Sequence, residues 1–363
     1  MKLTPVIAAA AALAAGLALA PRDAAAQQTI KLDGSSTVFP ISEAVAEEFQ
    51  IARRGKVRVT VGISGTGGGF KKFCRGEIDI SDASRPISKS EMDACAKAGI
   101  QYIELPVAYD ALTVAVNPKN TWVDTMTVAE LKKMWEPAAQ GKVKTWKDVN
   151  AKWPAQPLKL FGPGADSGTF DYFTEATVGK SKSSRGDFTA SEDDNVLVQG
   201  VESDVNALAY FGYAYYAPNA LKMKAVKIVN SKGQAVGPSP KGVLDGSYEP
   251  LSRPIFIYVS KASAQRAEVK EFVEFYLSKG APLVEEVKYV PLAKKAYDLA
   301  LANFRAGKAG TAFGGKNEVG LTVEELLARE GKFCVPSRRD GDTQKPCAVR
   351  EVDPAAQGPG SRH

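Results

Sequence analysis

The chain alternates short runs of β-branched and aliphatic residues with longer stretches in which apolar residues recur at helical spacing. Strands are predicted at 29–32, 57–63, 78–80, 102–107, 112–116, 158–161 and 254–260. Helices are predicted at 41–49, 128–135, 269–277 and 292–304, and Thr127 and Glu130 form a capping box before the second of these. The order of strand, polar turn and helix recurs at least three times. This order predicts an α/β fold with parallel sheets.

The N-terminus has the layout of a secretory signal peptide. Lys2 is followed by an apolar run from Pro5 to Ala20 and by small residues that end at Ala26. The alternative is a membrane anchor, but the run is shorter than the roughly 18 residues needed to span a bilayer. We therefore expect cleavage near Ala26, removal of residues 1–26 and a protein located in the periplasm.

Length and composition narrow the class of function. A chain of 363 residues suggests two domains, and 44% hydrophobic with 24% charged residues is an ordinary globular mixture. The single histidine is the last residue, His363, so the body of the chain cannot build a Ser-His-Asp triad, a Cys-His dyad or a histidine-ligated zinc. The 47 basic and 41 acidic residues are interleaved, which argues against a nucleic-acid partner despite a net charge of +6.

Four cysteines in an exported chain favour disulfide bonds. Pairing Cys74 with Cys95 and Cys334 with Cys347 closes two local loops and is the simplest of the three possible connectivities. A metal site is the alternative, but the cysteines lack CxxC spacing and a histidine partner. We expect structural disulfides, no metal and no cofactor.

Three predicted strand-to-helix turns combine hydroxyl side chains with glycine or an acidic residue: Ser35–Thr37, Ser64–Gly67 and Asp166–Thr169. At the start of a helix, such a turn offers backbone N–H groups and hydroxyl donors to an anion. In parallel α/β sheets these turns converge at the carboxyl ends of the strands, where ligands bind. A nucleotide is disfavoured because the chain has no GxxxxGK[ST], and residues 64–69 do not fit GxGxxG in its usual context. The sequence therefore predicts a small-anion site.

Four motifs occur together: DGSSTVFP at 33–40, SGTGGGF at 64–70, DASRP at 82–86 and GPGADSGTF at 162–170. In this order and spacing they resemble the substrate-binding protein of the bacterial high-affinity phosphate ABC transporter, over about residues 28–300. The resemblance implies a periplasmic-binding-protein fold, in which two α/β domains close a cleft over one inorganic phosphate. It also implies inner-membrane ABC permease subunits as partners and no enzymatic activity.

The same resemblance suggests where the domains divide. Domain 1 would comprise residues 27–108 and 251–320, and domain 2 residues 109–250, with the chain crossing near 107–111 and 247–254. Residues 321–363 would form a C-terminal extension that is partly flexible. We expect a monomer.

Ligand contacts in this family come from the matching turns. In this chain they are Ser36, Thr37, Val38, Ser64, Thr66, Asp82, Ser167, Gly168 and Thr169. Relatives often carry an arginine shortly before the Ser-Gly-Thr, whereas this chain has Gly162-Pro163-Gly164 there. Arg185 and Arg85 are candidates for the missing cation. We favour Arg185, which would lie in the same domain as Asp166 and pair with it.

Asp82 carries a prediction that does not depend on the resemblance. Near neutral pH phosphate keeps a proton, whereas sulfate has none. A buried carboxylate accepts a hydrogen bond from that proton but repels a fully ionised sulfate. The alternative is that Asp82 only caps a turn. At the level of function, the alternatives are another oxyanion (sulfate, molybdate or a phosphonate) or a secreted phosphatase, which the lack of histidine disfavours.

Two further stretches have structural interpretations. The aromatic run Tyr210–Tyr216 predicts a core strand rather than a stacking surface. The acidic run Ser191–Asn195 lacks the spacing of a calcium loop and predicts a cap for the helix that follows.

Overall fold

The computed structural model describes residues 27–316 and Arg329. The predicted signal peptide, the Cys334–Cys347 pair and the rest of the C-terminal extension lie outside the described residues.

The strands and helices alternate along most of the chain. The strands are β1 (Gln28–Gly34), β2 (Val57–Ile63), β3 (Ile80–Ala83), β4 (Tyr102–Val116), β5 (Thr125–Thr127), β6 (Lys159–Pro163), β7 (Thr189–Ser191), β8 (Ala207–Gly212), β9 (Lys224–Ala225), β10 (Lys227–Val229), β11 (Ala235–Val236), β12 (Ser252–Ser260) and β13 (Val290–Pro291). The α-helices are α1 (Phe39–Ala52), α2 (Gly65–Cys74), α3 (Lys89–Lys97), α4 (Val128–Trp135), α5 (Trp146–Val149), α6 (Gly168–Val178), α7 (Asp194–Ser203), α8 (Tyr213–Tyr216), α9 (Pro240–Leu244), α10 (Ala267–Glu286) and α11 (Lys294–Arg305).

One ten-stranded sheet runs through the protein in the order β2-β1-β3-β12-β4-β8-β6-β7, with β13 and β9 attached to β4. The pairs β1–β2, β1–β3, β6–β7 and β6–β8 are parallel, as predicted. The central strands β12 and β4 pair antiparallel with each other and with their other neighbours. The sheet is therefore mixed, and its parallel strands lie on the two sides of the β12–β4 centre.

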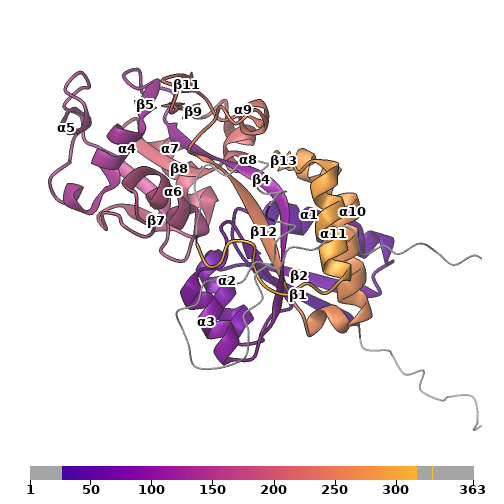
Figure 1. The fold of residues 1–363 in the computed structure, drawn as a ribbon. Coiled ribbons are helices and arrows are strands. Elements are labelled where there is room, and N and C mark those ends of the chain that lie inside the picture. Colours follow the sequence, from indigo (N-terminus) through magenta and orange to yellow (C-terminus); the bar gives the residue numbers. More distant parts are fainter. Residues whose placement is uncertain (1–26, 317–328, 330–363) are drawn as a thin grey trace, which may run out of the picture.

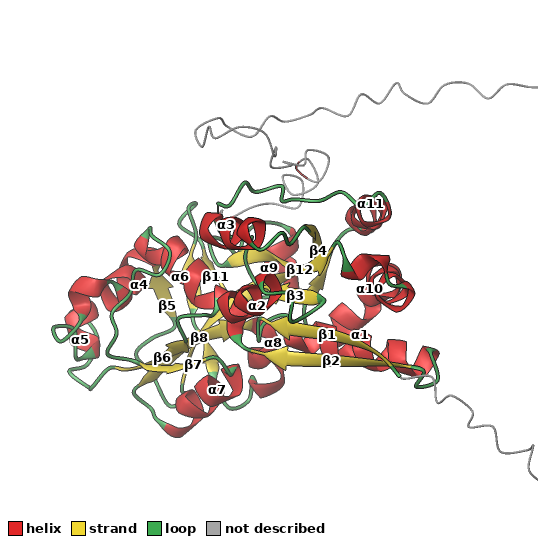
Figure 2. Cartoon of the chain, turned by 90° about the horizontal axis from the view of Figure 1, so that it is seen from below, coloured by secondary structure: helices red, strands yellow, loops and turns green. Residues whose placement is uncertain are grey.

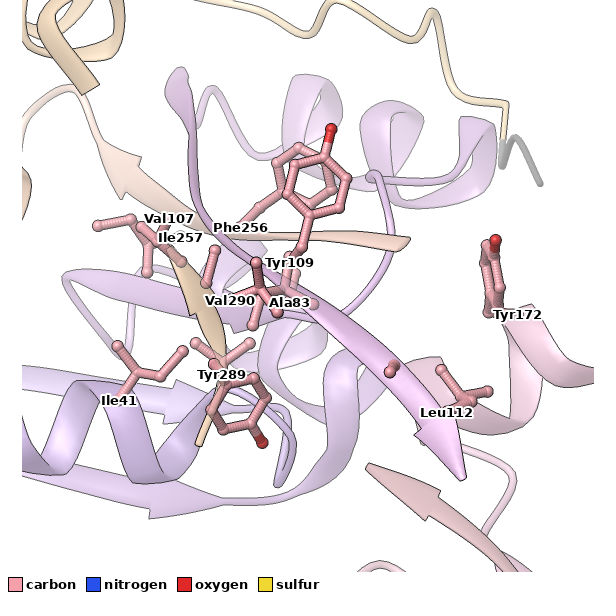
Figure 3. Packing of buried hydrophobic residues seen from close by; sticks show 14 of the residues in the cluster. Ile41, Ala83, Val107, Tyr109, Leu112, Tyr172, Phe256, Ile257, Tyr289 and Val290 are labelled. Carbon is pink, nitrogen blue, oxygen red and sulfur yellow. The ribbon is translucent and has the colours of Figure 1, made fainter. Parts of the chain in front are cut away.

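The elements form two lobes, which Figure 1 shows joined by β4 and β12. The first lobe holds β1, β2, β3 and helices α1, α2, α3, α10 and α11; the second holds β6, β7, β8 and helices α4 to α8. Helices α10 and α11 lie side by side against the first lobe (Figure 2). Buried side chains such as Val107, Ile257 and Leu112 line the joining strands (Figure 3).

The structure joins two of the predicted strands into one. Residues 102–107 and 112–116 were expected to be separate strands, but they belong to the single strand β4, which is buried along its whole length. The polar residue Asp110 interrupts the apolar pattern, yet it lies opposite Arg253 of β12 and forms an ion pair with it. Because its charge is matched inside the sheet, the chain continues without a turn.

The predicted helix caps and one predicted disulfide are confirmed. Thr127 and Glu130 form the predicted capping box of α4, and Asp193 caps α7 with its side chain. The predicted disulfide between Cys74 and Cys95 is present and joins α2 to α3. The aromatic run is a buried strand only as far as Gly212. Tyr213–Tyr216 form the short helix α8, whose side chains are only partly buried, so the strand prediction is wrong there.

No helix in residues 27–316 has the length and apolar character to cross a membrane. The same part of the chain contains no cluster of three or more His, Cys, Asp or Glu residues that could hold a metal ion.

Candidate functional site

The three polar turns of the first lobe are held together by backbone hydrogen bonds at the ends of β1, β2 and β3. Ser35 N donates to Asp82 O at 3.0 Å, and Ser64 N donates to Gly34 O at 3.0 Å. Glycine makes this approach possible: a Cβ on Gly69 would lie 2.7 Å from Gly34 Cα. Parallel strands thus bring the predicted turns to one edge of the sheet.

The start of α6 in the second lobe meets these turns. Ser167 caps the helix, its Oγ accepting from Thr169 N at 3.1 Å. Thr37 Oγ1 and Thr169 Oγ1 lie 2.9 Å apart, and Gly67 N donates to Asp166 O at 2.7 Å. The N-termini of helices α1, α2 and α6, each of which is the positive end of a helix dipole, therefore come together between the lobes.

Asp82 is fully buried at this junction. Its Oδ1 accepts a hydrogen bond from Ser42 Oγ at 3.0 Å, and Ser42 Oγ also lies 3.1 Å from Tyr276 Oη. Its Oδ2 has no hydrogen-bond partner among residues 27–316. Burial raises the pKa of Asp82 to about 8, while the Ser42 hydrogen bond opposes that rise and the charge of Asp33 adds to it. Asp82 thus offers one free oxygen that can share a proton.

Two hydroxyl groups in the predicted set have different surroundings. Ser64 Oγ donates to Asp33, whose other oxygen accepts from Lys72 Nζ at 2.7 Å, so the Ser64 hydrogen is already engaged. Thr66 Oγ1 accepts from Ser84 N at 3.1 Å and also lies 3.1 Å from Ser84 Oγ. A Cβ on Gly168 would overlap both Thr66 Oγ1 and Ser84 Oγ, which shows how closely the lobes approach.

The other residues predicted from the first turn also lie at the junction. Ser36 is buried, and its carbonyl oxygen accepts from Tyr215 Oη of the second lobe at 2.9 Å. Val38 is buried and directly precedes α1, its N–H donating to Ser35 O at 3.2 Å. The predicted residues from all four motifs are therefore brought together.

Arg185 is not among them. Its guanidinium donates to Asp187 Oδ1 at 2.5 Å, to Met134 O at 3.2 Å and to Val143 O at 3.0 Å. The expected pairing with Asp166 is wrong, because Asp187, only two residues away, takes the Arg185 charge. Asp166 instead pairs with Lys71 at 2.8 Å.

Arg85 lies between the lobes but is fully occupied by carboxylates. Its Nε donates to Asp171 Oδ2 at 2.5 Å, and its terminal nitrogens donate to both oxygens of Glu91 at 2.8 Å. Desolvation, the largest effect on its pKa, is outweighed by these acids, which hold the pKa of Arg85 above its ordinary value. Arg85 thus links Asp171 of α6 to Glu91 of α3 in the first lobe.

Sequence reasoning missed Arg253, a buried residue at the start of β12. Its Nη1 donates to Gly168 O at 2.7 Å, and its Nη2 donates to Thr169 Oγ1 at 2.7 Å. Its only sequence signal is a lone cation before the apolar run 254–260. Ser84 was missed as well, although it lies within the DASRP motif.

Comparison with known proteins identifies the family. A family model described as the PBP superfamily domain matches residues 20–279. Protein SphX of Synechococcus elongatus is 55% identical over 311 residues, covering 85% of this chain and 91% of SphX. The phosphate-binding protein PstS of Staphylococcus saprophyticus is 42% identical over 272 residues, covering 74% of this chain and 82% of PstS. The chain belongs to the phosphate ABC transporter substrate-binding protein family.

A solved structure of this family agrees with the architecture. The crystal structure of a possible phosphate binding protein from Planctomyces limnophilus is 51% identical with a TM-score of 0.58, covering 78% of this chain and 99% of that one. The predicted family and its periplasmic-binding fold are therefore confirmed. The individual ligand contacts stay predictions.

Proposed function

We propose that this protein captures inorganic phosphate between its two lobes and delivers it to an ABC importer. The main evidence for this ligand is Asp82, a fully buried carboxyl that lies where the three helix N-termini meet. Its Oδ2 has no hydrogen-bond partner within residues 27–316 and can therefore bind a ligand. A site of N–H and hydroxyl donors suits an anion, and one buried proton acceptor suits an anion that still carries a proton. The relatives named for phosphate binding support the same ligand.

The proposed ligand residues are those with donors at the junction. They are the hydroxyls of Thr37, Thr66, Ser167 and Thr169 and the backbone N–H groups of Ser36 and Gly168. The N–H of Val38, also predicted from the sequence, already donates to Ser35 O. Asp82 accepts the phosphate proton. Ser64 does not donate to the anion in this proposal, since its hydroxyl hydrogen is donated to Asp33; it orients the turn before α2. Arg185 takes no part, because its donors are held by Asp187 and by backbone carbonyls.

Binding and release proceed by movement of the lobes about β4 and β12. We place domain 1 at 27–108 and 251–320 and domain 2 at 109–250, so that the first crossing falls within β4 and the second directly before β12. Residues 1–26 act as a signal peptide cleaved near Ala26, and the mature protein works in the periplasm as a monomer that docks on the permease. No step of this function makes or breaks a covalent bond.

Calorimetric titration of the mature, ligand-stripped protein with phosphate and then with sulfate tests the ligand. We expect tight one-to-one phosphate binding and no sulfate binding. Burial raises the pKa of Asp82 to about 8, so the comparison is made above this pH, where the carboxyl is ionised. There Asp82→Asn no longer repels a fully ionised anion, so discrimination against sulfate weakens. Asp79→Asn is the matched control, because Asp79 is a buried acid that bonds Arg266 away from the site. Equal binding of both anions by the unmodified protein would contradict the proposal.

Two further tests separate the alternatives. A phosphatase would release phosphate from p-nitrophenyl phosphate, and we expect no turnover. An importer component would restore phosphate uptake to cells that lack their own binding protein, provided that the host permease accepts it. Turnover in the first test would favour the hydrolase.

A further inference from the structure

We propose that Arg253 is a positioning residue that makes the Thr169 hydroxyl a donor to the bound anion, in place of an arginine from the turn before Ser167. The inference rests on the proposed phosphate-binding function. Arg253 comes from β12, far in sequence from the four motifs, and its side chain is only 1% exposed. It therefore acts inside the protein and not as a surface charge that attracts anions.

The direction of the hydrogen bonds follows from the chemistry of arginine. A guanidinium group has donors and no acceptor. Because Arg253 Nη2 lies 2.7 Å from Thr169 Oγ1, the threonine oxygen must accept this bond. The hydroxyl hydrogen of Thr169 is then left for another acceptor, and Thr37 Oγ1 lies 2.9 Å away. An anion oxygen that enters between the two threonines takes the place of that acceptor.

The surroundings of Arg253 hold it in this orientation. Arg253 and Asp110 lie opposite each other in the β12–β4 ladder, and Nη2 and Nε lie 3.2 and 3.4 Å from Asp110 Oδ2. Its Nη1 donates to Gly168 O at 2.7 Å. Arg253 thus bonds both a backbone carbonyl and the Thr169 hydroxyl in the first turn of α6. The guanidinium carbon also lies 5.3 Å from the ring centre of Tyr172.

No other arginine within residues 27–316 donates to one of the proposed ligand residues. Arg85 is taken by Asp171 and Glu91, and Arg185 by Asp187. Arg253 thus brings a cation to the N-terminus of α6 through the strand that joins the lobes. A charge-assisted bond to Thr169 strengthens the donor that remains, because polarised hydrogen bonds reinforce one another in a buried site.

A double-mutant cycle on the mature protein tests the coupling by calorimetric phosphate titration. We expect Arg253→Met and Thr169→Val each to weaken phosphate binding about 30-fold, and the double variant to be no more than about threefold weaker than either. Arg266→Met is the matched control. Its guanidinium also bonds a carboxylate, Asp79, and a backbone carbonyl, Thr29 O, but lies away from the turns, so phosphate affinity stays at the wild-type value.

The outcomes separate the two proposals. If the unmodified protein does not bind phosphate, the proposed function fails. If it binds but Arg253→Met binds equally well, or if the two losses multiply in the double variant, Arg253 does not act through Thr169 and this inference is overturned. Thermal unfolding of each ligand-free variant checks the fold. Should Arg253→Met not fold, the same cycle with Arg253→Lys gives the coupling, since lysine keeps the charge but not the forked donors.

Discussion

Thr37 and Thr169 place their hydroxyl oxygens 2.9 Å apart, although 132 residues separate them in the chain. Thr37 lies just before α1 in the first lobe, and Thr169 lies in the first turn of α6 in the second. Their contact therefore joins two helix N-termini across the lobe boundary. Both helix dipoles favour negative charge at this place, and each threonine adds a hydroxyl donor.

Replacing Thr37 by valine keeps the shape of the side chain and removes its hydroxyl. We expect Thr37→Val to weaken phosphate binding about tenfold, the loss of one buried hydrogen bond, while Thr37→Ser stays within about threefold of wild type. Titration calorimetry of the three proteins under one buffer condition measures the difference. Equal affinity of the valine variant would remove Thr37 from the ligand set.

A substitution at Gly168 tests whether the two lobes must approach closely to bind phosphate. A Cβ at this position would overlap Thr66 Oγ1 and Ser84 Oγ of the opposite lobe, so Gly168→Ala is expected to keep the lobes apart and lower phosphate affinity by about 100-fold. Gly186→Ala is the control, because its added Cβ would meet only Gln140 Oε1 at 3.5 Å, an ordinary contact. Small-angle scattering with saturating phosphate should show the control more compact than Gly168→Ala. A compact, tightly binding Gly168→Ala would show that the contact relaxes easily.

The buried acids predict how stability depends on pH. Burial raises the pKa of Asp82 and of Asp194 from 3.8 to about 8, and that of Glu104 from 4.5 to about 7. Between pH 4 and these values the folded protein binds more protons than the unfolded chain, so the free energy of unfolding falls as pH rises.

Denaturant unfolding of the ligand-free protein between pH 5 and 8 measures this slope. Asp82→Asn removes one of the three groups, and its slope should be shallower by roughly 1 kcal/mol per pH unit. A slope identical to that of wild type would mean that Asp82 ionises in the empty site with little penalty.

Arg185→Met distinguishes the arginine favoured by sequence from the one that the geometry favours. Arg185 bonds Asp187 and two backbone carbonyls, so its loss leaves buried acceptors unpaired and should lower the unfolding temperature. Phosphate affinity should remain within about threefold of wild type. A loss of phosphate affinity as large as that expected for Arg253→Met would show that Arg185, as predicted from the sequence, contributes to anion binding.

Predictions from sequence succeeded where the determining residues are close together. The capping box of Thr127 and Glu130 spans one helical turn, and the strand 57–63 is bounded correctly because its aliphatic residues alternate with other residues at the spacing of a strand. The four motif turns were found because their hydroxyls and glycines are local features of each strand-to-helix junction. These features were sufficient to predict the fold and most of the proposed site.

The part of the proposed site that the sequence did not predict depends on the ion pair between Asp110 and Arg253. Asp110 and Arg253 are 143 residues apart, and each looks alone like a polar interruption of an apolar strand. The sequence alone therefore predicts two strands, 102–107 and 112–116, on either side of Asp110, and gives no role to Arg253. Arg185 differs, because the acid that pairs with it, Asp187, lies only two residues away in the sequence.

The continuity of β4 has a mechanical consequence. Since β4 runs from Tyr102 to Val116 without interruption and pairs with elements of both lobes, the lobes are joined by sheet and not by a slack tether. Any opening must be absorbed as a change of twist in β4 and β12. The stiffness of these paired strands, and not the length of a linker, then sets how far apart the two lobes can move.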